Sequence, residues 1–275
     1  MRPSERKTFN APEGFGKGPP LVDLEDFKRW ILFENKNLLV LNKPGWLVCH
    51  PSKRGPFSSL VGAAKEYLEL DRVHLISRLD RETSGLVLLA KNRPSGSLFQ
   101  RALEQRRVKK EYLAIMRGVA PEQMMTVDQP LAKDHGGKVH SKQAVRRDRT
   151  SQEARTRFQV LHQGAKWCLC RVMPETGRKH QIRAHAEWLG CPIGGDKLYS
   201  GDPDCFLEFR AHGWTESLSR RLYFPRQALH AYKMTFFLSD ACWFWTAPPP
   251  EDFQQFARKA LGKECPEWTD TKILQ

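Results

Sequence analysis

The apolar run from Leu86 to Ala90 is the sequence feature that most constrains the fold. With Gly85 it reads GLVLLA, so the polar–apolar alternation of a strand with one face in water is absent. An apolar run of this length between polar segments predicts a strand that is buried on both faces in the interior of a sheet. Such a strand requires other elements to cover both sides of its sheet.

Shorter patterns predict the elements around this strand. Apolar residues at helical spacing predict helices at 21–33, 58–70, 95–106 and 181–189, with Ser95 as the cap of the third, and a short helix after Ala247. Short apolar runs predict strands at 38–42, 46–49, 112–116, 155–160, 166–173 and 229–238. We expect 120–150 to form an extended hairpin or loop and 196–224 to form a long irregular loop. Together these elements predict one mixed α/β domain.

The chain shows no internal repeat and no linker between two cores. Residues 1–20 are rich in Pro, Gly and Lys, which predicts a flexible basic N-terminal extension. We therefore expect a single domain over 21–258, followed by a C-terminal tail over 259–275.

The cysteines and the hydropathy pattern indicate the cellular compartment of the protein. The chain has seven cysteines, an odd number, and none lies in a C-x-x-C motif. Cys168 and Cys170 are spaced like neighbouring strand positions rather than like zinc ligands, so we expect reduced, mostly packed thiols. No apolar run approaches the ~18 residues of a membrane span, and no secretory signal is present. These features predict a cytoplasmic protein with no membrane association.

A strong excess of positive charge indicates a polyanionic partner. The chain has 45 Lys+Arg and 31 Asp+Glu, which gives a net charge of +14. Two stretches concentrate the excess: 101–117 has six basic and two acidic residues, and 138–157 has seven basic and two acidic residues. A single such stretch is usually a solvated face, but two of them with a global excess favour nucleic acid.

Asp80 is the first candidate for chemistry. It lies between Arg78 and Arg81, just before the turn that leads into the predicted buried strand. Neighbouring guanidinium groups favour the ionised form of a carboxylate, which a rigid strand end would hold in place. On spacing alone, however, the simpler interpretation is that Asp80 caps a turn through its side chain.

A second polar cluster covers residues 175–190, with the sequence ETGRKHQIRAHAEWLG. A turn at Thr176–Arg178 leads into a predicted helix whose N-terminal end favours an anion. His180 and His185 are five residues apart, so they do not share a helical face and we expect no metal site. Packing of both histidines as polar core residues is the simpler interpretation.

The motifs in these regions resemble one family, the RluA-type RNA pseudouridine synthases. Ser77–Leu86 (SRLDRETSGL) resembles the family signature H-R-L-D-x-x-T-S-G around its catalytic aspartate, with Ser77 in place of the usual His. Five further segments are similar to family elements in the same order, and they are Asn42–Pro51, Val108–Tyr112, Thr176–His185, Cys191–Asp196 and Arg226–Ala231. The resemblance extends from about residue 30 to 253. It implies an α+β fold, a single catalytic domain with a mixed, largely antiparallel central sheet flanked by helices and loops.

The resemblance also implies an activity. Such enzymes are isomerases that detach uracil from its ribose in RNA and rejoin it through C5, without metal, nucleotide or redox cofactor. Asp80 would be the catalytic carboxylate, Tyr112 would stack on the uracil, and Arg183 would pair with Asp80. Whether Asp80 attacks the sugar, adds to the ring or acts as a base stays open at this point.

The remaining expected contacts concern the RNA. The uridine must leave its stack, and Arg78 would fill the vacated space, while Ile182 would form an apolar wall for the base. Lys110 and Arg178 are expected to contact phosphates or to support the site. About thirty residues precede the first core strand, too few for a separate RNA-binding domain, so we expect the basic stretches to bind RNA, notably through Lys142, Arg146 and Arg147.

The resemblance implies an RNA pseudouridine synthase acting on ribosomal or transfer RNA, and a monomer is the default expectation because the sequence does not fix the oligomeric state. Two alternatives remain. One is a non-catalytic RNA-binding relative, against which the combination of Asp80, Tyr112 and Arg183 argues. The other is a glycosidase acting on nucleic acid, which would need a second carboxylate such as Glu82.

Overall fold

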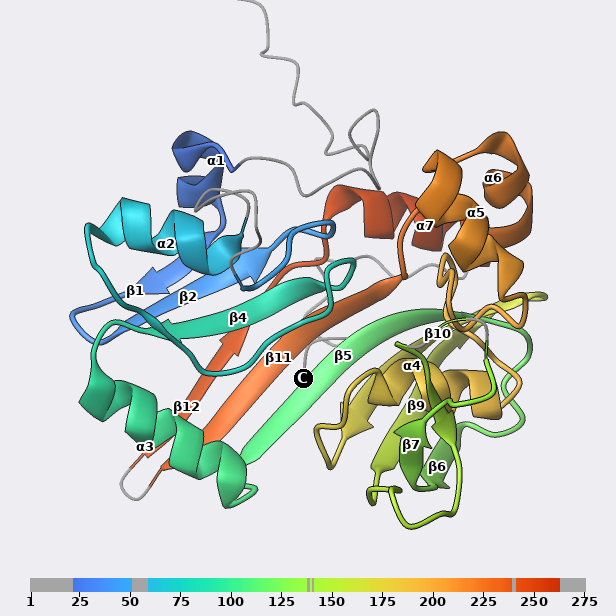
Figure 1. Cartoon of the computed structure of the whole chain (residues 1–275), viewed down its shortest axis with the longest axis horizontal. Helices are drawn as coiled ribbons and strands as arrows, with labels where there is room; N and C mark the ends of the chain where they lie inside the picture. Colours follow the sequence, from blue (N-terminus) through green and yellow to red (C-terminus); the bar gives the residue numbers. More distant parts are fainter. Residues whose placement is uncertain (1–21, 51–58, 138, 140, 239–240, 263–275) are drawn as a thin grey trace, which may run out of the picture.

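A ten-stranded mixed sheet forms the centre of the protein (Figure 1). The computed structural model describes residues 22–50, 59–137, 139, 141–238 and 241–262. Along the main path the strands follow the order β1 (Ile31–Glu34), β2 (Leu38–Lys43), β4 (Ser84–Ala90), β11 (Leu229–Leu238), β5 (Val108–Arg117), β10 (Trp167–Pro174), β9 (Arg155–Gln163) and β6 (Met124–Asp128). Two further strands, β12 (Ala241–Thr246) and β3 (His74–Leu75), pair with β11 and β4.

Strand β4 confirms the prediction made from the apolar run. All of its residues are buried, and it lies between β2 and β11 in the sheet interior. The β4–β11 pair is parallel and the other pairs are antiparallel, so the predicted mixed, largely antiparallel sheet is confirmed. At Gly85 φ is +111°, and a Cβ atom would lie 2.2 Å from the Ala231 carbonyl oxygen of β11. Only glycine permits this approach, which holds the turn after Asp80 against β11.

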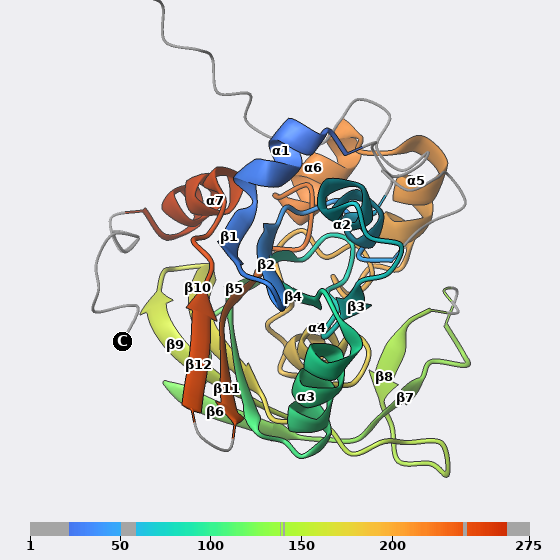
Figure 2. The ribbon, with the colours of Figure 1, turned by 90° about the vertical axis from the view of Figure 1, so that its left-hand side faces the viewer.

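Seven helices in the described part of the chain flank the sheet. They are α1 (Leu24–Arg29), α2 (Leu60–Leu68), α3 (Arg93–Glu104), α4 (Gln181–Trp188), α5 (Asp204–His212), α6 (Glu216–Leu222) and α7 (Glu251–Leu261). Helix α3 packs on β4 and β11, and α4 packs on β9 and β10. Both lie on the side of the sheet that Figure 1 turns to the viewer, and Figure 2 shows the hairpin of β7 (Leu131–Lys133) and β8 (Gln143–Val145) extending from the same side.

Several element predictions are wrong, and each error has a physical cause. The predicted helix over 21–33 ends at Arg29, and its last residues form β1. Helix α3 is capped by Asn92, whose side chain accepts from Ser95 N–H, instead of by Ser95. The predicted strand at 46–49 is a turn, because the carbonyls of Val48 and Cys49 accept from the first N–H groups of α2.

The predicted irregular loop at 196–224 contains helices α5 and α6. Their buried faces, formed by Cys205, Phe209, Leu218 and Leu222, pack around Trp46. At the other end of the domain, α7 continues to Leu261, three residues beyond the expected domain end at 258. Most of the expected extension and tail lies outside the described residues.

The described cysteines confirm the sequence interpretation. All six are free thiols, five of them buried, with Cys168 and Cys170 on β10 and only Cys242 exposed. None of the described helices has the length and apolar character needed to cross a membrane.

Candidate active site

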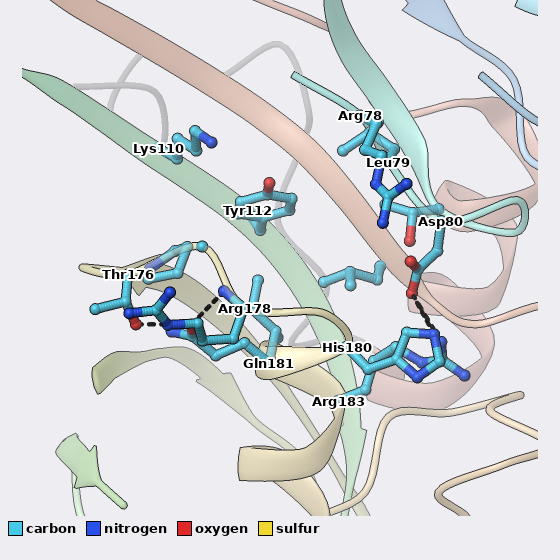
Figure 3. A pocket seen from close by; sticks show the side chains of 15 residues that line it. Arg78, Leu79, Asp80, Lys110, Tyr112, Thr176, Arg178, His180, Gln181 and Arg183 are labelled. Atoms are coloured by element: carbon cyan, nitrogen blue, oxygen red, sulfur yellow. Dashed lines mark hydrogen bonds and ion pairs between the residues drawn. The ribbon is translucent and has the colours of Figure 1, made fainter. Parts of the chain in front are cut away.

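A pocket of about 130 Å³ brings together the two sequence clusters (Figure 3). Its walls are the loop between β3 and β4, the middle of β5 and the turn between β10 and α4. Seven of the ten residues predicted from the sequence line it, and they are Arg78, Asp80, Lys110, Tyr112, Arg178, Ile182 and Arg183. Segments more than a hundred residues apart in the chain therefore form one site.

Arg183 connects two carboxylates at the base of this pocket. Its Nη1 donates to Asp80 Oδ2 at 2.7 Å, so the expected pair is present (Figure 3). Its Nε and Nη2 donate to the two oxygens of Asp196 at 2.6 and 2.9 Å. Asp196 is fully buried and also accepts from the backbone of Leu198 and Tyr199. This two-point contact fixes the guanidinium plane and aims its remaining nitrogen at Asp80.

Asp80 is ionised at neutral pH. Burial alone would raise the pKa of Asp80, but the Arg183 guanidinium outweighs burial and holds that pKa below its ordinary value. The side chain is one-third exposed, and the turn behind it is closed by a backbone bond from Thr83 N–H to the Asp80 carbonyl. The carboxylate therefore faces the pocket and the guanidinium, which argues against the interpretation of Asp80 as a side-chain turn cap.

His180 is the second group near the Asp80 carboxylate. Its Nε2 lies 3.8 Å from Asp80 Oδ2, and its Nδ1 lies 3.0 Å from the Tyr199 hydroxyl. Burial, with the nearby Arg183 charge, lowers the pKa of His180 to about 4. The imidazole is therefore neutral at pH 7, and the positive charge beside Asp80 belongs to Arg183.

Tyr112 and Ile182 give the pocket its less polar walls. Tyr112 lies on β5 and Ile182 on the first turn of α4. Burial and the nearby Asp80 charge raise the pKa of Tyr112, so the phenol keeps its proton at neutral pH. It can donate a hydrogen bond or stack on a planar ring, but it is a poor base.

Gln181 holds the β10–α4 turn in position. Its Oε1 accepts from Thr176 Oγ1 at 2.7 Å and from Arg178 N–H at 2.9 Å, while its Nε2 donates to Thr156 Oγ1 at 2.9 Å. His180, which precedes the helix, has a left-handed φ of 54°. The turn is thus shaped by one buried amide, and Arg178 is held both through its backbone N–H and through its side-chain Nε.

Polar residues behind Asp80 support the site, and apart from the glycosidase alternative for Glu82 the sequence predicted no role for them. Glu82 Oε2 accepts from Lys197 Nζ at 2.8 Å and from Gln227 N–H at 3.2 Å. Arg226, 1% exposed, donates to both oxygens of Asp252 and to the Glu82 carbonyl. Glu82 and Arg226 lie in segments that resemble family elements, and this resemblance is the feature of the sequence that could have indicated these buried contacts.

Glu82 faces away from the pocket. It lines a neighbouring cavity together with Lys197 and Asp80, whereas Asp80 is the only carboxylate among the described residues that line the pocket itself. A second carboxylate for glycosidase chemistry is thus lacking among them.

Three predicted RNA contacts lie away from the pocket. Lys142 forms an ion pair with Glu187 at 2.8 Å, and Arg146 forms one with Asp148 at 3.3 Å. Arg147 donates to Gln129. Much of the 138–157 charge is thus paired with acidic side chains.

Two other sequence observations have structural counterparts. Ser77, which differs from the family pattern, has a buried Oγ with no hydrogen-bond partner among the described residues. His185 is fully buried, and its two ring nitrogens contact Thr156 Oγ1 and the Gln129 carbonyl, so it packs as a polar core residue. No group of three potential metal-ligating side chains occurs in the described part of the chain.

Comparisons with known proteins agree with this geometry. Residues 37–188 match the family described as RNA pseudouridylate synthase. The Haemophilus influenzae protein named ribosomal large subunit pseudouridine synthase D is 31% identical over 247 residues, covering 85% of this chain and 74% of that protein. An uncharacterized RNA pseudouridine synthase of Mycoplasma pneumoniae is 36% identical over 200 residues, covering 72% of this chain and 64% of that protein.

A solved structure shares the fold. The human protein titled RNA pseudouridylate synthase domain containing 4 superposes with a TM-score of 0.69 at 29% identity. The match covers 86% of this chain and 94% of that one.

Proposed function

The chain belongs to the RluA-type family of RNA pseudouridine synthases, and we propose that it isomerises specific uridines of ribosomal or transfer RNA to pseudouridine. One observation carries the proposal: an ionised Asp80, paired with Arg183, faces a pocket whose volume suits a single base. The family relationship supplies the reaction, and this carboxylate supplies the group that would perform it.

The reaction breaks the N1–C1′ bond of uridine and forms a C5–C1′ bond, while C5 loses a proton and N1 gains one. Both ring positions must be reached, so the uridine leaves its stack, at a cost of a few kcal/mol. The proposed Arg78 contact suits this step, because Arg78 is exposed at the pocket rim and a guanidinium plane stacks on bases. Tyr112 and Ile182 would enclose the uracil.

The electrostatics favour a nucleophilic role for Asp80. A carboxylate with a depressed pKa is a weak base at neutral pH, and Arg183 offsets its charge through a contact with Oδ2. We therefore propose that an Asp80 oxygen bonds to C1′ of the flipped nucleoside as the N1–C1′ bond breaks, and that this Asp80–C1′ bond breaks in turn when C5 bonds to C1′, rather than proton abstraction by Asp80. Tyr112, protonated at neutral pH, would act as a stacking and hydrogen-bonding partner.

Binding of the RNA strand is assigned to the basic side chains. Lys110, Arg178 and Arg78 line the pocket and would contact backbone phosphates or bases. Lys142, Arg146 and Arg147 would add weaker contacts farther away. The free, mostly buried thiols are typical of a protein in the cytoplasm, and ribosomal and transfer RNAs are found in that compartment.

The decisive experiment is pseudouridine mapping of total RNA from cells with and without this protein. We expect at least one uridine to lose modification in its absence and to regain it with the wild-type chain or with Asp128→Asn, which alters an exposed carboxylate. Asp80→Asn should give no product while its RNA affinity stays within severalfold. An unchanged map together with intact RNA binding would instead identify a non-catalytic relative.

A further inference from the structure

A second groove opens directly beside the pocket. Its volume is about 470 Å³, several times the 130 Å³ of the pocket. It lies between the end of α3 and the β10–α4 turn, and Arg78, Lys110 and Arg178 line both spaces. An RNA strand with one nucleotide in the pocket would therefore have the groove directly beside it, across these shared side chains.

Lys110 stands at the junction of the two spaces. Its ammonium has no hydrogen bond or ion pair with the described residues, although burial lowers its pKa. A partly buried, unpaired cation is costly unless a ligand supplies the opposite charge. Lys109, the next residue along β5, is exposed and lies over the Phe237 ring at 5.3 Å, outside both spaces.

The rest of the groove is suited to a nucleotide. Ile76, Leu103 and Val108 provide apolar surface, and Arg106 adds a further exposed cation at the rim. Of its two acids, Glu175 is engaged by Arg157 at 2.9 Å, while Glu104 lies exposed at the end of α3. The groove thus combines apolar walls for a base with an excess of cations for a phosphate.

We propose that this groove is a subsite for one nucleotide adjacent to the target uridine, with its phosphate on Lys110 and its base against the apolar wall. The proposal rests on the proposed function, because it takes the uridine to occupy the neighbouring pocket. It assigns to Lys110 a specific phosphate, the one between the flipped uridine and its neighbour.

The test pairs charge removal on the RNA with charge removal on the protein. The probes are the pentanucleotide AAUAA and two versions in which the phosphate 5′ or 3′ of the uridine is an uncharged methylphosphonate. Affinities of the full chain are measured by fluorescence anisotropy at fixed salt. Lys110→Met removes the proposed contact, and Lys109→Met is the matched control with the same change in net charge.

We expect one methylphosphonate to weaken binding to the wild-type chain about tenfold, as for a lost charge-assisted hydrogen bond. The same methylphosphonate should weaken RNA binding by the Lys110→Met variant less than twofold. It should weaken RNA binding by the Lys109→Met variant by the full tenfold. An abasic neighbour on that side should also weaken binding to the wild-type chain. Because Lys110→Met replaces an unpaired ammonium by an apolar group, its melting temperature should be unchanged or higher. A thermal denaturation curve therefore shows that the variant is folded.

Equal losses in Lys110→Met and Lys109→Met, or no binding of the pentanucleotides, would overturn the subsite. These readouts need no turnover. If the methylphosphonate loss depends on Lys110 but no pseudouridine forms, the proposed function alone is contradicted. If pseudouridine forms but the loss does not depend on Lys110, the subsite alone is contradicted.

Discussion

Arg183 sets the charge of the pocket by standing between a buried and a partly exposed carboxylate. Asp196 holds two of its nitrogens, so the third has one direction available, toward Asp80. Burial acts on Asp80 in the opposite sense to Arg183, and the balance keeps the carboxylate ionised. The Arg183 guanidinium is thus the largest of the influences that keep the proposed nucleophile ionised.

Arg183→Met should shift the acid limb of the pH–activity profile to higher pH. Burial would then raise the pKa of Asp80 without an opposing cation, so the active, ionised form would require a higher pH. At pH 7 we expect activity to fall by about 10- to 100-fold, the value of a lost charged hydrogen bond. The measurement is the initial rate of pseudouridine formation between pH 4.5 and 8.5.

His180→Asn provides the comparison for this profile. Its imidazole is neutral above about pH 4, so its removal should bring no acid limb into the measured range of pH 4.5 to 8.5, unlike the removal of the Arg183 charge. A limb that moves with His180→Asn and stays in place with Arg183→Met would assign the electrostatic control to the wrong residue.

Ser77 and Ser84 form a second contrast between single side chains. The Ser77 hydroxyl is buried without a partner, whereas Ser84 Oγ lies 3.0 Å from His230 Nδ1 in the core. Ser77→Ala should therefore leave the free energy of unfolding unchanged or raise it by up to about 1 kcal/mol. Ser84→Ala should lower it by about 1–3 kcal/mol, since the His230 nitrogen loses its donor. Urea denaturation of both variants decides, and a large loss at Ser77 would reveal a contact at that hydroxyl.

At the scale of elements, α5 and α6 form a small helical unit that packs against the turn at Trp46. Leu218 on α6 is fully buried in this cluster, and Thr215 caps the helix by accepting from Leu218 N–H at 3.1 Å. The unit also contributes Phe206, Phe209 and Arg210 to the cavity on the far side of Asp80. This segment is therefore part of the folded frame of the site.

Leu218→Ala should lower the free energy of unfolding by about 2–5 kcal/mol, the usual cost of a large-to-small change in a core. Leu207→Ala on α5 is the matched control, because Leu207 is 38% exposed and should cost less than about 1 kcal/mol. Urea denaturation measures both. Equal, small losses would mean that the α5–α6 unit does not pack in solution as it does here.

Elements with strong local patterns were predictable, and those defined by tertiary contacts were not. The continuous apolar run specified β4 and its burial, because no other element of that length hides every side chain. Cys205 with Phe209 and Leu218 with Leu222 have helical spacing, but surrounding charged residues obscured it. The turn at 46–49 could not be predicted, because its carbonyls bond to α2 and to the buried Lys43 ammonium.

The candidate site shows the same division. Motif order located Asp80, Tyr112 and Arg183, which do meet in one pocket. The contact that orients Arg183 comes from Asp196, a residue that only tertiary folding brings beside it. Charge counting along the chain could not distinguish free cations from those paired with acids, as at Lys142 and Glu187.

For the whole molecule, the net charge is +14, but the basic side chains differ in how many of them are already paired with carboxylates. In the 138–157 stretch several cations are matched by carboxylates, among them Arg146 by Asp148. Around the pocket and the adjoining groove, Arg78 and Arg106 are exposed and form no ion pair with the described residues. A cation already paired with a carboxylate gains less from a phosphate, so binding should depend more on the rim than on the richer stretch.

The double variant Arg78→Ala/Arg106→Ala should therefore reduce the salt dependence of RNA binding more than Lys142→Ala/Arg146→Ala, although both remove two charges. Each phosphate contact contributes about 0.7 to the slope of log affinity against log salt for single-stranded RNA, so we expect the rim pair to lower that slope by about 1.4. The second pair should lower it by less than half as much. Anisotropy titrations of a 15-nucleotide RNA from 50 to 300 mM KCl measure both slopes. Equal reductions would show that net charge alone, rather than its placement around the pocket, governs the attraction of RNA to this protein.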